Sequence, residues 1–398
     1  MTMFSLSSIS KRLFSHKLHS IYLTGFLLLS IGGYLPSAYS YALFSSYGID
    51  RATIELFFVY CFVASLFVGT FVASLADRFG RRLACLSCSF FYGLYHVACH
   101  FPSKQSLIIG HIFRGIGDAL YATAFEAWLM QEHKQRNLND QHLEYTLNNA
   151  NIYLNIATIG TGFLAQLLAK SYGYIAPFTV GVGFFMITFI FIVCHWSENY
   201  GREKSHMHAS FISAMKILRA DTRILLCGLC NALFSASSYI WLIEWAPTLE
   251  AATNLTISKP LPLGYIYSGY LSSRLFGACM SGPLLKRFRP QMLLSILYLI
   301  AALALSIPII MPDEQIIVLF GFVVFQICIG TFWPAIALLR SEYIPNELRS
   351  TLMNYLRVPQ LLLMLIVLLG HFSLSTVFTL CVSMLFVAMF IMLLLRKL

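Results

Sequence analysis

Long apolar runs separated by short polar breaks constrain the fold of this 398-residue chain more than any other feature of its sequence. A helix needs about 20 predominantly apolar residues to cross the hydrocarbon core of a bilayer. Runs of this kind recur along the whole chain, and a longer polar segment divides the first six from the last six. The composition agrees, since 58% of the residues are apolar and only 11% are charged. The runs lie near residues 21–44, 54–75, 83–101, 106–130, 145–169, 174–194, 224–247, 263–284, 291–311, 315–339, 349–370 and 372–395.

The apolar runs predict an all-α membrane protein with twelve transmembrane helices in two six-helix halves. Backbone N–H and C=O groups find no water inside a bilayer, so each crossing segment must satisfy them internally, as a helix does. The first run is too long for a signal peptide and is read as a retained span, in which Gly32, Gly33 and Pro36 predict a bend. The expected parts are a cytoplasmic N-terminus, an N-terminal half, a cytoplasmic linker and a C-terminal half, at 1–20, 21–194, 195–223 and 224–395.

The positions of Lys and Arg predict the orientation. If the N-terminus is cytoplasmic, the inside segments carry 20 of the 27 Lys and Arg residues and the outside loops carry 4. Cytoplasmic loops of membrane proteins are enriched in these residues. Both termini are therefore expected in the cytoplasm. The net charge of +10 then reflects topology, and nucleic acid is not expected as a partner.

A weak internal repeat supports the division into two halves. The break after the second run reads "ASLADRFGRR" from Ala73, and the break after the eighth reads "GPLLKRFRPQ" from Gly282. Both combine an apolar pair, a basic residue and Phe. Transporters commonly use two repeats of this kind to build a central site.

Several motifs resemble one family. "LADRFGRR" is similar to the loop signature of the major facilitator superfamily. Four further strings resemble the branch of that superfamily known as the molybdate-anion transporters: "AFEAW" at 124–128, "ENYGRE" at 198–203, "PAIALLR" at 334–340 and "NYLRVP" at 354–359. The resemblance implies a secondary active transporter of a small oxyanion such as molybdate, working by alternating access. Two alternatives stay open: a transporter of a neutral sugar or drug, and a receptor or scaffold that transports nothing.

Arg114 and Asp118 are the leading candidates for the substrate site. A charge at the centre of a transmembrane helix costs roughly 2.5–3.5 kcal/mol on insertion scales, so such residues usually face a cavity or a partner. A rise of about 1.5 Å per residue places the two near mid-membrane. In one interpretation they only neutralise each other. In the other, Arg114 binds an anion and Asp118 carries a coupling proton.

Further polar residues lie at membrane depth in other predicted spans. A surplus of deep arginine makes a cavity positive and favours an anionic substrate. Asn151 and Asn155 share one face of their helix, where they either bind substrate or join helices. The remaining candidates for substrate binding are Arg274, Arg357, Gln326 and Asn354.

Glu126 is expected at the cytoplasmic interface, where a charge costs little. The superfamily resemblance implies that it pairs with a loop arginine, Arg81, and that Asp77 packs near Arg349. This cluster is predicted to control opening on the cytoplasmic side. Its predicted members are Asp77, Arg78, Gly80, Arg81, Arg82 and Glu126.

The ten cysteines include two CxxC pairs, Cys85/Cys88 and Cys227/Cys230, each inside an apolar run. Without a second pair nearby we interpret them as small buried residues. The chain has no GxSxG, HExxH, Walker or dinucleotide-binding motif, so no enzyme activity, cofactor or metal is expected. We expect a monomer in the lipid bilayer of the plasma membrane, with a small anionic molecule as its substrate.

Overall fold

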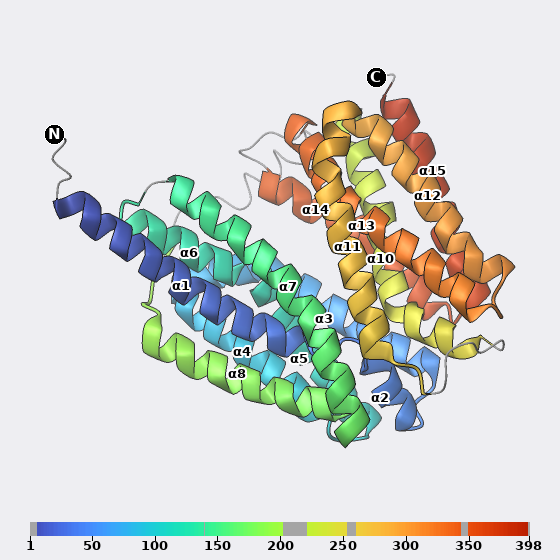
Figure 1. Cartoon of the computed structure of the whole chain (residues 1–398), viewed down its shortest axis with the longest axis horizontal. Coiled ribbons are helices and arrows are strands. Elements are labelled where there is room, and N and C mark those ends of the chain that lie inside the picture. The colour runs from blue at the N-terminus through green and yellow to red at the C-terminus, as the bar shows by residue number, and fades with distance from the viewer. Residues whose placement is uncertain (1–5, 139, 202–220, 253–259, 344–348, 397–398) are drawn as a thin grey trace. The chain divides into compact units, whose positions relative to one another are not determined.

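The computed structural model describes residues 6–138, 140–201, 221–252, 260–343 and 349–396, and these residues form helices and no β-strand. Figure 1 shows their arrangement and labels. The helices are α1 (Leu6–Tyr34), α2 (Ser40–Ser46), α3 (Arg51–Phe79), α4 (Arg81–Ala98), α5 (Lys104–Tyr121), α6 (Ala124–Gln135), α7 (Asp140–Tyr172), α8 (Ala176–His195), α10 (Thr222–Ala251), α11 (Leu263–Arg287), α12 (Pro290–Ile310), α13 (Gln315–Tyr343), α14 (Arg349–Leu369) and α15 (Leu374–Leu395).

Two of the predicted spans are broken in the structure. The first consists of α1 and α2, which are separated by turns at residues 35–39, and this confirms the bend predicted at Pro36. The run predicted at 106–130 is divided into α5 and α6 by a turn at Ala122 and Thr123. Each of the other ten predicted spans corresponds to one helix.

Seven of the described helices are long and apolar enough to cross a membrane by length and composition alone. They are α3, α7, α8, α10, α12, α13 and α15. Helix α5 shows why other helices fall short, because its 18 residues include Lys104, Arg114 and Asp118. Two of these charged residues, Arg114 and Asp118, are the candidates for substrate binding, because charged residues inside a membrane are usually functional.

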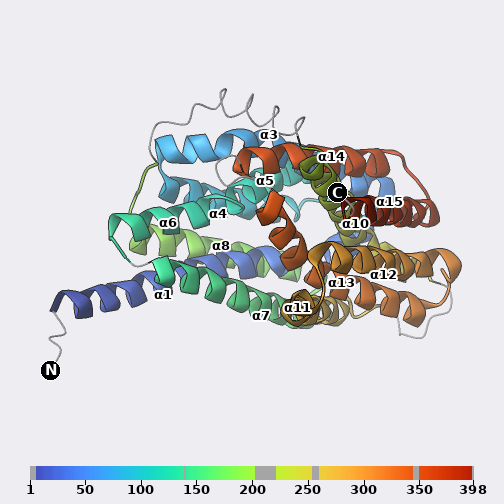
Figure 2. The same ribbon diagram turned by 90° about the horizontal axis from the view of Figure 1, so that it is seen from above.

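The chain divides into two compact units. The first unit comprises residues 1–50 and 57–204, and the second comprises 51–56 and 205–398. In the first unit, α4 packs against α5 and α8, and α1 packs against α7 and α8, as Figures 1 and 2 show. The core of this unit includes Trp128 and Trp196, whose rings stack with centroids 3.7 Å apart.

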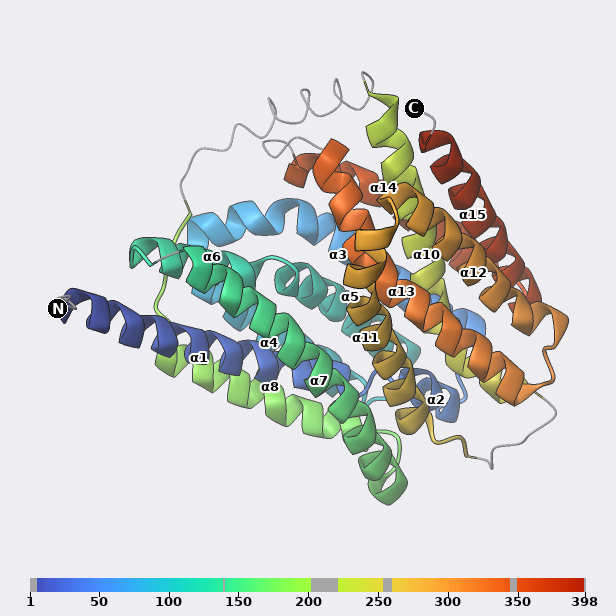
Figure 3. The ribbon, with the colours of Figure 1, turned by 45° about the horizontal axis from the view of Figure 1, so that its top comes forward.

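The second unit is built around α10, which packs against α13, α14 and α15. Helix α11 lies along α13, and α12 lies between α13 and α15, as Figure 3 shows. Asp221 caps the N-terminus of α10 by accepting a hydrogen bond from the N–H of Arg223 at 2.9 Å. The hydrogen bonds from Arg223 hold the pKa of Asp221 below its usual value.

Candidate functional site

Close packing of α5 against α3 and α4 places Asp118 next to two neutral donors. A Cβ on Gly115 would meet the backbone of Cys61, and one on Gly117 would meet the ring of Tyr92, so only glycine permits this approach. The hydroxyl of Tyr92 donates to one oxygen of Asp118 at 2.7 Å. The thiol of Cys61 donates to the other oxygen at 3.4 Å. Both carboxylate oxygens of Asp118 therefore have partners other than arginine.

Arg114, one helical turn before Asp118, is held by aromatic rings. Its guanidinium carbon lies 5.4 Å from the ring centroid of Phe58 and 5.4 Å from that of Tyr95. Its side chain also donates one long hydrogen bond, of 3.4 Å, to the hydroxyl of Tyr95. Among the described residues no ion pair within 4.0 Å joins Arg114 to Asp118. The long hydrogen bond to Tyr95 is the one that the structure gives for the five N–H donors of Arg114.

His111 packs against Tyr95, one of the rings that hold Arg114. Its side chain is fully buried, and its ring packs against the rings of Phe57 and Tyr95. Nδ1 lies 2.8 Å from the carbonyl oxygen of Leu107, while Nε2 has no hydrogen-bond partner among the described residues. The imidazole therefore packs among the aromatic rings that lie next to Arg114.

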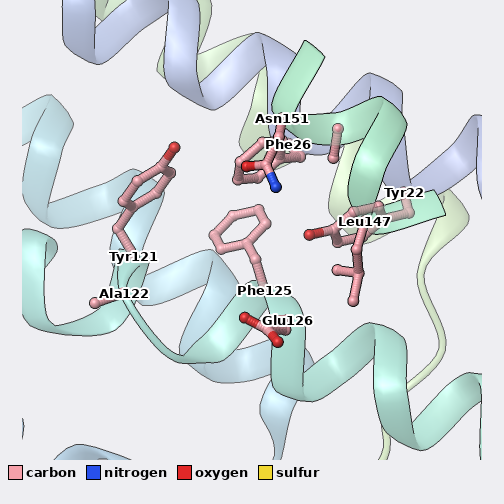
Figure 4. A pocket seen from close by; sticks show the side chains of 9 residues that line it. Tyr22, Phe26, Tyr121, Ala122, Phe125, Glu126, Leu147 and Asn151 are labelled. Atoms are coloured by element: carbon pink, nitrogen blue, oxygen red, sulfur yellow. The ribbon is translucent and has the colours of Figure 1, made fainter. Parts of the chain in front are cut away.

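A separate pocket of about 220 Å³ lies at the junction of α1, α6 and α7. In Figure 4 the ring of Phe125 stands between the carboxylate of Glu126 and the amide of Asn151. The predicted candidate Asn155 does not line this pocket but donates to the backbone oxygen of Asn151 at 2.7 Å. The lining consists of Tyr22, Phe26, Tyr121, Ala122, Phe125, Glu126, Leu147, Ala150 and Asn151.

The expected ion pair between Glu126 and Arg81 is not formed. Arg81 pairs instead with Asp77, one turn earlier, at 2.7 Å, and donates to the backbone oxygen of Ala127 at 2.9 Å. Glu126 is exposed and lines the pocket. The i, i+4 spacing favours the local pair because it needs no other element to bring the two charges together. The other expected contact, of Asp77 with Arg349, lies outside the described side chains.

The loop between α3 and α4 is held by the segment that follows α8. Gly80 has a φ of +118°, a conformation that side chains rarely adopt, and a Cβ there would meet the carboxylate of Glu198. That carboxylate accepts hydrogen bonds from the N–H groups of Arg82 and Leu83 at 2.8 and 3.2 Å, and so caps α4. Arg78, by contrast, is exposed.

The second unit has its own buried polar pair. The Nε of Arg274 on α11 donates to the side-chain oxygen of Gln326 on α13 at 2.9 Å. Gln326 is fully buried, and its Nε2 has no hydrogen-bond partner among the described residues. The structure thus joins two of the predicted candidates. Two others, Asn354 and Arg357, lie on α14, but their side chains are outside the described part of the structure.

A family model described as sugar transporters with 12 transmembrane segments matches residues 9–328. The chain belongs to this family of the major facilitator superfamily. It is a transporter and an integral multi-pass membrane protein, and it is not an enzyme.

Curated relatives of this transporter include two molybdate-anion transporters. The protein of Xenopus tropicalis is 26% identical over 336 residues, which are 82% of this chain and 73% of the relative. That of Danio rerio is 24% identical over 385 residues, covering 86% of this chain and 77% of the relative. Among solved structures, the peptide transporter PepTSo superimposes with a TM-score of 0.77 at 12% identity, over 96% of this chain and 97% of the other. This last likeness concerns the fold alone.

The residues that hold Arg114 and Asp118 in this transporter were not predicted from the sequence. Tyr92, Tyr95, Cys61 and Phe58 are apolar or weakly polar residues in long apolar helices, where dozens of similar residues occur. The spacing of three between Tyr92 and Tyr95 was the available signal, because it places both hydroxyls on one face of α4. Glu198, which caps α4, belongs to the string "ENYGRE", and nothing in that string indicates the contact with α4.

Proposed function

We propose that this transporter carries a small oxyanion such as molybdate, by alternating access, with Arg114 as its main ligand in the first unit. The observation that carries the proposal is the state of Arg114, which is held by two rings and lacks an ion pair with Asp118 among the described residues. A guanidinium offers a planar fork of donors that matches the oxygens of an oxyanion. The names of the curated relatives support the same substrate class.

Arg274 is proposed as a second ligand, within the second unit. Gln326 holds its guanidinium through a hydrogen bond that uses Nε. Asp118 is proposed to carry a coupling proton, because its two partners are neutral groups that do not fix its charge. We further propose that the protein works as a monomer in the plasma membrane, with the cluster around Asp77 and Arg81 controlling the cytoplasmic opening.

Transport of a neutral solute such as a sugar is the second candidate. The pocket at Phe125 supports it, because aromatic rings together with Glu126 and Asn151 suit a molecule with many hydroxyl groups. The description of the matching family also names sugar transporters. Nothing in that pocket offers a positive charge to an anion.

Uptake into proteoliposomes distinguishes the two candidates. We expect labelled molybdate or sulfate to accumulate, and more strongly when the pH outside is lower than inside. Arg114→Gln should abolish uptake, and Asp118→Asn should remove the response to the pH gradient. Asp313→Asn, an exposed carboxylate, is the matched control and should behave like the unmodified protein. Sugar uptake without any oxyanion uptake would overturn the proposal in favour of the neutral solute.

A further inference from the structure

Two buried carboxylates share one arginine in the second unit, which includes the first turn of α3. The Nε of Arg51 lies 2.8 Å from Oε1 of Glu55 and 2.9 Å from Oε2 of Glu244. The Glu244 side chain is 0% exposed and that of Glu55 is 4% exposed, whereas Arg51 is 23% exposed. We call Glu55 and Glu244 the acid pair. Arg51 therefore lies between the acid pair and the surface.

The charges of this group do not balance if both carboxylates are ionised. One guanidinium compensates one carboxylate, and a second buried negative charge would remain without a partner, which is strongly unfavourable. The same Nε contacts both carboxylates, while Nη2 of Arg51 and Oε1 of Glu244 have no hydrogen-bond partner among the described residues. Nη2 of Arg51 is therefore not hydrogen-bonded to either carboxylate.

Among the described residues, the neighbouring helices contribute no positive charge that could compensate the second carboxylate. Helix α15 contributes the thiol of Cys381, and α13 contributes the neutral amide of Gln315, which donates to the backbone oxygen of Leu249. Helix α11 contributes aromatic residues, which pack on Trp241 and Trp245. The charged residues of α14 are Arg349 and Arg357, whose side chains lie outside the described part.

The two carboxyl groups also lie close to each other, because an oxygen of each lies within 2.9 Å of the same Nε of Arg51. Two ionised carboxylates are both acceptors, so a hydrogen bond between them requires a proton on one of them. When two carboxylates share a site, like-charge repulsion keeps one of them protonated.

We propose that Glu55 and Glu244 hold a single exchangeable proton between them, at a proton-binding site distinct from Asp118. Arg51 neutralises the remaining negative charge, so the protonated site has no net charge. Loss of the proton leaves two carboxylates facing one guanidinium. Arg51 is the most exposed member of this group.

Infrared spectroscopy of the purified protein tests this proposal without any substrate. A protonated carboxyl group has a C=O stretching band that an ionised carboxylate lacks. We expect the wild-type band to contain a pH-sensitive component that Glu55→Gln and Glu244→Gln each remove and that Asp118→Asn leaves in place. Arg51→Gln should instead strengthen the band, because without the guanidinium both acids must be protonated. Glu342→Gln, at an exposed carboxylate of the same unit, is the matched control and should leave the band unchanged.

Three outcomes would overturn the proposal. They are a component that survives both Gln variants but is lost in Asp118→Asn, an Arg51→Gln variant with a weaker band, and a wild-type band identical to that of the double Gln variant. Each variant is first checked for a single symmetrical peak in size-exclusion chromatography, and the Gln side chain nearly matches Glu in shape. The measurement separates this site from the proposed function, because a failure of oxyanion uptake would not alter the band.

Discussion

At the scale of single residues, the chemistry of Arg114 depends on the rings around it. Placing a guanidinium over aromatic faces stabilises the charge without using its N–H donors. An ion pair with Asp118 would have used some of those donors. The first unit therefore keeps a deep positive charge that is held in place but not neutralised by direct contact with Asp118.

Because of this arrangement, a lysine at position 114 should bind the transported anion less well than Arg114 does. We expect Arg114→Lys to raise the KM for the transported anion by about 10-fold or more, because a hydrogen bond to a charged group is worth about 1.5–3 kcal/mol and each 1.4 kcal/mol is about tenfold. Lys keeps the charge but loses the planar fork and the stacking. Initial rates of uptake at a series of anion concentrations measure the effect.

Arg287→Lys is the matched control, because Arg287 is exposed at the end of α11. Its KM should equal that of the wild type. An Arg114→Lys protein with an unchanged KM would show that the fork of donors does not bind the anion.

At the scale of helices, the close contact between α11 and α13 positions Arg274 against Gln326. Gly330 on α13 faces the backbone of Arg274 and Ala278 on α11, where a Cβ has no room. Gly277 on α11 faces the backbone of Ile327 in the same way. The hydrogen bond between Arg274 and Gln326 thus depends on a separation that only glycine permits.

Gly330→Ala is expected to destabilise the second unit. Overpacking of a tight contact costs about 1–3 kcal/mol, and here the opposing atoms belong to backbone that cannot rotate away. The apparent melting temperature in detergent should fall. Gly269→Ala on α11 should leave it unchanged or raise it slightly, because no atom lies within 4 Å of a Cβ there and Ala is the better helix former. Equal melting temperatures for the two variants would contradict this account.

The helices could be predicted from the sequence, whereas the side-chain pairs between helices could not. Apolar length and the position of Pro36 predicted the helices and one break, because both follow from local backbone chemistry. The break at Ala122 and Thr123 has no Pro or Gly to signal it. The partner of Arg81 was predicted wrongly, since the resemblance pointed to Glu126 while the nearer Asp77 forms the pair. Pairs formed between helices, such as Arg274 with Gln326, depend on packing that periodicity does not specify.

At the scale of the whole molecule, the confirmed features are the all-helical class and the membership of the major facilitator superfamily. The position of the termini rests on the distribution of Lys and Arg and stays a prediction. Because 20 of these residues fall in the predicted inside segments and 4 in the outside loops, the bias is far larger than a few residues could reverse.

Epitope tags at the two ends test the orientation. We expect both tags to bind antibody only after the cells are permeabilised. A tag inserted at the turn around Gly173, between α7 and α8, should bind antibody on intact cells and serves as the control. Labelling of either terminus on intact cells would show that the charge bias does not set the topology.

The cysteines of the structure have a practical consequence for measuring motion. All of the ten are free thiols, and only Cys194 and Cys279 are exposed. Cys194 belongs to the first unit and Cys279 to the second. The natural sequence thus supplies one exposed thiol in each unit, while the other thiols are buried. A pair of spin labels at these two positions reports the distance between the units, and how substrate changes it, without any mutation of the protein.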